Sequence, residues 1–195
     1  MSFTVGREDK IGIVGRNSKA ISVLYDVLMG KETADSGYYK WGKTITPTYL
    51  PVDNDEYFVG CDLSLVDWLS RYSYDHYEEF VRGWLARMLF SGEESQKKAS
   101  VISGGEKVRC MLAKMMLEGG NFMILDEPTN HLDLESITAL NDGLVAFKGC
   151  LLMTSHDREL MNTVCNRIIE IDGGKKVYDR PVDYDTYLEE TMNKQ

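Results

Sequence analysis

The run FMILDE, residues 122–127, constrains the fold of this chain more than any other sequence feature. Its apolar part is uninterrupted, which is typical of a strand that is buried on both faces, as in a parallel sheet covered by helices. A second apolar run, CLLM at residues 150–153, follows after a helical pattern at residues 134–147. Strands that alternate with helices through short links predict an α/β fold with a parallel sheet.

The same alternation is present at both ends of the chain. We expect strands at SFTV and KIGIV, a helix at 22–29 that stops at Gly30, and short strands at YYKWG and ITPTYL. The remaining predicted elements are helices at 104–118, 157–164 and in DYDTYLEETM, and strands at 121–126, 150–154, 167–171 and 175–178. Apolar residues take helical spacing between residues 63 and 90. We therefore expect one domain, residues 1–195, with a helical subdomain of about residues 63–118 inserted in its α/β core.

Composition excludes several classes of function. A chain of 195 residues with 43% hydrophobic and 27% charged residues fits a soluble globular domain. The formal net charge of −9 disfavours direct nucleic-acid binding, which depends on basic side chains that neutralise phosphates. We find no pattern of a signal peptide and no apolar run that could cross a bilayer, so we expect a cytoplasmic location without membrane insertion. The four cysteines are far apart and predict free thiols.

The ends of the two apolar runs carry groups that suit phosphate chemistry. Ligands of open α/β sheets bind beyond the carboxyl ends of the strands, where Asp126, Glu127 and His156 are expected. Because side chains alternate along a strand, Asp126 would orient a Mg²⁺ shell while Glu127 faces an attacking water as general base. The plainer explanation is that both strands simply end in polar residues.

The stretch SGGE, residues 103–106, predicts the start of a helix. Ser103 and Glu106 have the spacing of a capping box. Gly104 and Gly105 are poor helix formers, each costing roughly 1 kcal/mol relative to alanine. Either the segment is only a cap, or the bare backbone lets a phosphate approach the N–H groups at the helix N-terminus.

Together these stretches resemble the ATP-binding cassette (ABC) superfamily. The signature helix of that family resembles ISGGEKVRCMLAKMML, its Walker B strand and D-loop resemble FMILDEPTNHLD, and its switch-histidine segment resembles LLMTSHD. The segment DEPTNHLDLES is similar to ABC-F proteins, which are soluble chains with two cassettes, many of which act on the ribosome. The whole chain resembles the second, C-terminal cassette of a bacterial ABC-F protein.

The resemblance implies a fold, cofactors and roles for particular residues. The implied fold is a RecA-like P-loop NTPase core with a parallel sheet, an inserted helical subdomain and a truncated N-terminal β-subdomain. ATP and Mg²⁺ would bind between two cassettes paired head to tail, as a homodimer or heterodimer, with the ribosome as a further expected partner. The implied roles are Mg²⁺ orientation by Asp126, general base catalysis by Glu127, γ-phosphate sensing by His156, a D-loop contact by Asp133, and capping of the partner's ATP by Ser103, Gly104, Gly105 and Glu106.

The stretch GIVGRNSKAISVL departs from the family's phosphate-binding Walker A loop, GxxGxGK[ST][ST]. The loop would comprise Gly15, Arg16, Asn17, Ser18, Lys19, Ala20, Ile21, Ser22 and Val23. Ile21 occupies the position of the lysine, while Ser22 keeps the hydroxyl that would meet Mg²⁺. Lys19 lies two positions too early, and we expect it in the loop rather than in the first helical turn.

Two further departures concern the same nucleotide site. Val52 stands where the family carries a polar residue after its YLP-like strand. The family's first strand, with an aromatic residue that stacks on adenine, would precede Met1.

These departures predict an asymmetric cassette, whose own ATP site is impaired and whose signature can complete the site of a partner. As an isolated domain it would be an ATP hydrolase with weak or lost activity, and Ile21→Lys would gain ATP affinity if the rest of the site is sound. Three alternatives stay open: ATP binding through the backbone N–H groups of the loop alone, an ATPase subunit of an ABC transporter, and a catalytically dead cassette that acts as a scaffold.

Overall fold

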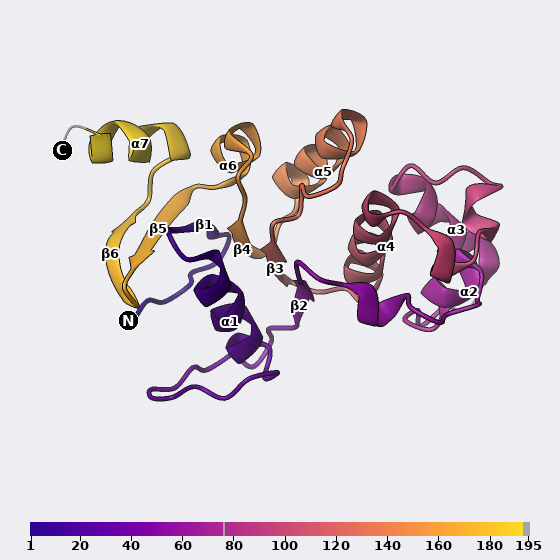
Figure 1. The fold of residues 1–195 in the computed structure, drawn as a ribbon, viewed down its shortest axis with the longest axis horizontal. Helices are drawn as coiled ribbons and strands as arrows, with labels where there is room; N and C mark the ends of the chain where they lie inside the picture. Colours follow the sequence, from indigo (N-terminus) through magenta and orange to yellow (C-terminus); the bar gives the residue numbers. More distant parts are fainter. Residues whose placement is uncertain (76, 193–195) are drawn as a thin grey trace.

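The computed structural model describes residues 1–75 and 77–192, which fold around a six-stranded sheet (Figure 1). Its strands are β1 (Lys10–Gly15), β2 (Pro47–Leu50), β3 (Phe122–Asp126), β4 (Cys150–Thr154), β5 (Arg167–Asp172) and β6 (Lys175–Arg180). The order is β2-β3-β4-β1-β5-β6, and every pair except β5 with β6 is parallel, which confirms the predicted α/β fold. β6 runs antiparallel because only Gly173 and Gly174, both with positive φ, join it to β5.

Helices cover both faces of the sheet, as the apolar runs predict. On one face, Phe122 and Ile124 of β3 join a cluster with Tyr25 of α1 (Ser18–Leu28). On the other face, Met123 and Leu125 join a larger cluster. It includes residues of α5 (Leu134–Ala146), α6 (Arg158–Val164) and α7 (Tyr184–Met192). Figure 1 shows α1 on one side of the sheet and these three helices on the other.

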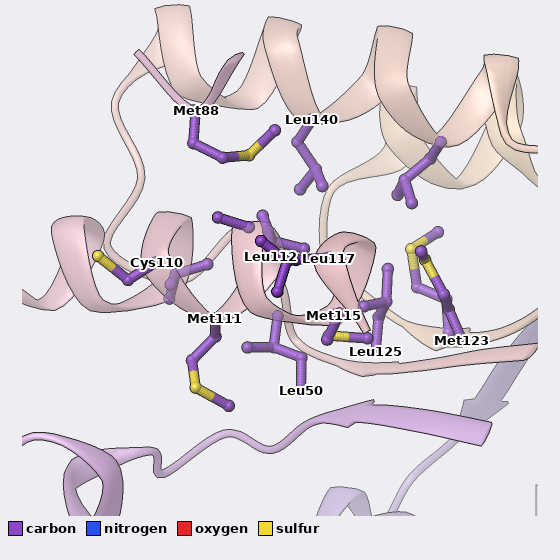
Figure 2. Close-up of a cluster of buried hydrophobic side chains, with 14 of the residues drawn as sticks. Leu50, Met88, Cys110, Met111, Leu112, Met115, Leu117, Met123, Leu125 and Leu140 are labelled. Atoms are coloured by element: carbon purple, nitrogen blue, oxygen red, sulfur yellow. The ribbon is translucent and has the colours of Figure 1, made fainter. Parts of the chain in front are cut away.

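A helical block lies beyond the β2 edge of the sheet. It contains α2 (Leu65–Ser70), α3 (Glu78–Arg87) and three short 3₁₀ turns: η1 (Asp55–Tyr57), η2 (Glu94–Gln96) and η3 (Ala99–Val101). It is joined to the core by α4 (Gly104–Leu117). Figure 2 shows Leu50 of β2 near Met111 on one side of α4 and Leu140 of α5 on the other. The division into a core and an inserted subdomain of about residues 63–118 stays a prediction.

Two predicted strands are wrong. Residues 1–9, all of which the structure describes, form no strand, and β1 is already paired with β4 and β5 on its two edges. SFTV is instead held by a hydrogen bond of 2.9 Å from Arg167 Nη1 to the carbonyl of Thr4. YYKWG, also within the described residues, forms no strand, because Trp41 packs on Phe122 and donates its indole N–H to the carbonyl of Leu28 at 3.2 Å.

The helix predicted at residues 22–29 starts four residues earlier, at Ser18. The strand predicted at ITPTYL is shorter and spans Pro47–Leu50. The predicted elements between residues 104 and 192 agree with the observed ones to within two residues at each end. Because α1 starts early, residues 18–23 of the stretch that resembles the Walker A loop are helical.

Candidate functional site

The carboxyl ends of β3 and β4 bring together the predicted acidic residues and the predicted histidine. Asp126 pairs with Thr154 in the sheet register, and the Thr154 hydroxyl donates to Asp126 Oδ1 at 2.8 Å. Asp126 is only 2% exposed, and its Oδ2 has no hydrogen-bond partner among the described residues. The hydroxyl of Tyr25 is also buried and unpartnered within the described part of the chain. Asp126 Oδ2 and the Tyr25 hydroxyl, both on the α1 face of the sheet, could therefore bind a polar ligand.

Burial sets the charge state of this cluster. It raises the pKa of Asp126, while the nearby hydroxyl groups of Ser22 and Thr154 act in the opposite direction. It also raises the pKa of Tyr25 well above 10, and the nearby charge of Asp126 adds to that shift. The hydroxyl of Ser22, which is predicted to meet Mg²⁺, lies near Asp126. It donates its own hydrogen bond to the Ser18 carbonyl at 3.3 Å.

Glu127 and His156 form a contact at the mouth of the site. Glu127 has a left-handed backbone with φ of 51°, which turns the chain out of β3. Its Oε2 accepts a hydrogen bond of 3.2 Å from the backbone N–H of His156, and its Oε1 lies 3.6 Å from His156 Nε2. Burial raises the pKa of Glu127, and His156 partly offsets this. A carboxylate with a raised pKa next to an exposed histidine suits general base catalysis.

A cavity of about 270 Å³ extends from these carboxylates to the start of α4. Asp126, Glu127 and Gly104 line it, as do two residues that the sequence did not single out, Asn54 and Lys107. Asn54 is 6% exposed, and its Nδ2 has no hydrogen-bond partner in the described residues. The sequence expectation concerns only Val52, directly after Pro51, whereas the buried amide lies three residues beyond the proline.

The predicted capping box is confirmed at the start of α4. The Glu106 backbone N–H donates to Ser103 Oγ at 3.3 Å, and the Ser103 backbone N–H donates to Glu106 Oε2 at 2.8 Å. Lys97 lies 2.7 Å from Glu106 Oε1, so this carboxylate is also ion-paired within the chain. Gly104 and Gly105 are therefore the first two residues of a capped helix, and their backbone N–H groups have no carbonyl partner within that helix.

The predicted Walker A stretch does not form a loop that wraps around phosphates. β1 ends at Gly15 and α1 begins at Ser18, so only two residues connect them. Asn17 caps α1, because its Oδ1 accepts the Ala20 backbone N–H at 3.1 Å. The prediction that Lys19 lies in a loop is wrong, since it belongs to the first turn of α1. Residues 16–20 are all exposed, and so is Val23.

Ile21, at the position of the missing lysine, is part of the apolar core. It is 4% exposed and packs in the cluster between α1 and the sheet. A Cβ on Gly15 would approach Ile21 Cδ1 to 3.2 Å, which shows how closely the start of α1 lies on β1. A lysine at this position would place an ammonium in an apolar cluster, so the expected gain of ATP affinity from Ile21→Lys alone loses its structural basis.

Asp133 is the N-cap residue of α5. Its Oδ1 accepts the Ser136 backbone N–H at 2.8 Å and caps α5, and these bonds lower the pKa of Asp133. In the described residues, no three His, Cys, Asp or Glu side chains gather into a metal site. A magnesium ion would therefore rely on Asp126 and Ser22 together with ligands from elsewhere.

Comparisons with known proteins agree with this geometry. A family model described as "ABC transporter" matches residues 1–130. The chain is 58% identical over 190 residues to "Uncharacterized ABC transporter ATP-binding protein YkpA" of Bacillus subtilis (strain 168), covering 97% of this chain and 35% of that protein. It is 34% identical over 179 residues to "Energy-dependent translational throttle protein EttA" of Mycobacterium tuberculosis (strain CDC 1551 / Oshkosh), covering 89% and 31%. The chain spans about a third of the length of these relatives.

A solved structure shares the fold at low sequence identity. It is the "Dimeric structure of a post-hydrolysis state of the ATP-binding cassette MJ0796 bound to ADP and Pi", with a TM-score of 0.75 and 13% identity over 92% of this chain and 88% of that chain. Within the described residues of the present chain, every helix is too short or too polar to cross a membrane.

Proposed function

Because the chain belongs to the ATP-binding cassette family, we propose that it is one cassette of an ABC-F-type ATPase and completes the ATP site of another cassette. The observation that carries the proposal is an asymmetry between its two nucleotide-facing surfaces. The Walker A stretch is folded into α1, with Ile21 buried, whereas the start of α4 keeps a capped SGGE motif. A cassette of this kind contributes its signature to a composite site and holds little nucleotide itself.

The residues fit the two expected ligands unequally. The unpartnered Oδ2 of Asp126, as found among the described residues, fits the water shell of Mg²⁺, and the Ser22 hydroxyl lies nearby. When bound, Mg²⁺ would neutralise phosphate charge. Residues 15–22 do not fit a triphosphate, because the cap on Ala20 and the buried Ile21 leave neither a loop nor a lysine.

Two observations support the ABC-F assignment. The relatives include EttA, whose name describes a throttle of translation, and the segment that follows β3 reads NHLD. We therefore propose the ribosome as the larger partner and a cytoplasmic location. Co-sedimentation of the chain with 70S ribosomes tests this. Recruitment by a membrane protein instead, with no ribosome binding, would favour the transporter subunit that the YkpA name suggests.

Calorimetric titration with ATP-Mg tests the state of the chain's own site. We expect no measurable binding to the wild type and none to Ile21→Lys, which should also unfold more easily. A dissociation constant near 1 μM for the wild type, about −8 kcal/mol, would contradict the proposal.

A loop-restored chain, Ser18→Gly/Ala20→Gly/Ile21→Lys, provides the positive control. The two glycines weaken the first turn of α1 by roughly 1 kcal/mol each and favour a loop, and the lysine supplies the charge. We expect this chain to bind ATP-Mg. The matched variant Ser18→Gly/Ala20→Gly, which lacks the lysine, separates the effect of the loop from that of the charge. If all three variants and the wild type turn over no ATP with any second cassette, the scaffold alternative is favoured.

A further inference from the structure

The signature glycines pack against a residue of their own chain, which gives them a second reason to be glycine. A Cβ placed on Gly105 would lie 2.6 Å from the backbone carbonyl oxygen of His131. A Cβ on Gly104 would lie 3.3 Å from both Cβ and Cγ of His131. The first distance is shorter than real Cβ contacts, and the atom it meets belongs to the backbone. The bare backbone of Gly105 is therefore required inside the chain, whether or not a phosphate approaches it.

His131 is held in this place by the turn that leaves β3. The Asn130 N–H donates to the Glu127 carbonyl at 3.1 Å, and the Leu132 N–H donates to the Thr129 carbonyl at 3.2 Å. His131 itself has a left-handed φ of 67°, which an L-residue adopts at a cost and which points to a functional constraint. The same turn begins at Glu127, which is also left-handed. The histidine therefore has a fixed relation to the carboxyl end of β3.

We propose that His131 is a positioning residue for the signature. Its carbonyl lies against Gly105 and its ring against Gly104, and together they set the direction in which the first N–H groups of α4 face outward. A triphosphate held by another cassette would meet these N–H groups in the orientation that His131 fixes. This role rests on the proposed function, whereas the packing beneath it can be tested on the chain alone.

The first experiment measures thermal unfolding of Gly105→Ala without nucleotide or partner. We expect Tm to fall by about 5 °C, because the new Cβ cannot avoid the His131 carbonyl. The matched control is Gly83→Ala in α3, an exposed helical glycine with no atom of the described residues within 4 Å of the added Cβ. Its Tm should stay equal or rise slightly. If Gly105→Ala is as stable as Gly83→Ala, this glycine serves only ligand approach and the proposal is wrong.

The second experiment follows the backbone amide signals of Gly104 and Gly105 by NMR in His131 variants. His131→Gly keeps the left-handed backbone easily but removes the ring, so both signals should shift and exchange faster with solvent. His131→Asn also adopts this backbone readily and keeps Cβ and Cγ, the two closest atoms to Gly104, so it should restore the wild-type signals. Unchanged signals in His131→Gly would overturn the positioning role.

The third experiment measures ATP turnover of the loop-restored chain when that chain also carries each His131 variant, so that every composite site contains the variant signature. We expect His131→Gly to lower turnover at saturating ATP about tenfold, and His131→Asn to keep most of it. A loop-restored chain with His131 intact that turns over no ATP would refute the proposed function but leave the amide result standing. Full turnover with His131→Gly, together with shifted amide signals, would show that the packing has no part in completing the site.

Discussion

Asp126 is an ionisable residue that the fold buries. It is 2% exposed, its closest partners are hydroxyl groups, and burial raises its pKa. A pKa raised in the folded state means that the native protein binds this proton more tightly than the unfolded chain. The contribution to stability is therefore fully present below the unfolded pKa, about 3.9, and is lost as the pH rises through the folded pKa.

Asp126→Asn should therefore stabilise the chain at neutral pH. We expect the free energy of unfolding at pH 7.5 to rise by about 1–3 kcal/mol, because the amide keeps an acceptor for the Thr154 hydroxyl and carries no charge. Urea unfolding between pH 3.5 and 8 is the measurement, and the gain should shrink toward the acid end. Asp142→Asn, at an exposed position of α5, is the control and should change little. A loss of stability at pH 7.5 would mean that a cation neutralises Asp126 in solution.

At the scale of single elements, the start of α1 decides whether residues 15–22 form a helix or a loop. Local signals for the helix are present, since Asn17 is a favoured N-cap residue and Ile21 and Tyr25 lie one turn apart on the buried side. The family's Walker A pattern instead has glycine at positions 18 and 20, where it would weaken this turn, and lysine in place of Ile21. The resemblance to the family predicts a loop at these residues, whereas the local signals favour the helix that the chain forms.

Asn17→Ala should loosen the first turn of α1. Loss of the side-chain acceptor for the Ala20 N–H costs about 1 kcal/mol, or roughly 2–4 °C in Tm for a chain of this size. Asn17→Ser keeps an acceptor at the same position and should remain close to the wild type. Thermal unfolding followed by circular dichroism distinguishes them. Equal Tm values for both variants would show that the cap does not hold this turn.

Other elements show what local patterns can and cannot predict. The bounds of β3, α5 and β4 follow from apolar runs and from the capping residue Asp133, which are local signals. SFTV alternates polar and apolar residues as a half-buried strand does, but a strand also needs a free edge, and that depends on the sheet order. The carboxylates of the site were predicted for the same reason as β3, since they end it. The contact between His131 and Gly105 could not be predicted from sequence, because it joins residues 26 positions apart through tertiary packing alone.

At the scale of the whole molecule, Arg167 joins three segments that are distant in sequence. Its guanidinium lies 2.9 Å from Asp9 Oδ2 and 2.8 Å from Asp179 Oδ1, so it connects the N-terminal segment, β5 and β6. Hydrogen bonds from Arg167 lower the pKa of Asp179. A lowered pKa contributes stability that is present above the unfolded value, about 3.9, and is lost as the pH falls through the folded one.

Arg167→Met should therefore weaken the fold in a pH-dependent way. We expect a loss of about 2 kcal/mol at pH 7, less than for a fully buried pair because the Arg167 side chain is 18% exposed. The difference from the wild type should begin to shrink as the pH falls below the unfolded pKa, about 3.9, and should be lost once the pH has passed the lowered pKa of folded Asp179. Arg158→Met is the matched control, since its pair with Asp185 is 69% and 43% exposed and should contribute 1 kcal/mol at most, roughly. Equal losses in both variants, measured by urea unfolding, would refute a special role for Arg167.

The asymmetry of the cassette predicts the stoichiometry of its assembly. If the chain's own Walker A stretch holds no nucleotide, as we propose, ATP-Mg should leave the wild type monomeric. A pair of one wild-type and one loop-restored chain contains a single complete site, formed by the restored loop of one and the signature of the other.

Adding Glu127→Gln to the loop-restored chain removes the proposed general base, so bound ATP should persist. Sedimentation velocity with labelled ATP should then give a mixed dimer with one nucleotide, and a homodimer of the loop-restored chain with two. Wild-type chain that carries Gly105→Ala should fail to form the mixed dimer, because its signature is displaced. Two nucleotides in the mixed dimer would mean that α1 of the wild type opens into a binding loop when a partner signature closes over it, so that the asymmetry would belong to the isolated chain alone.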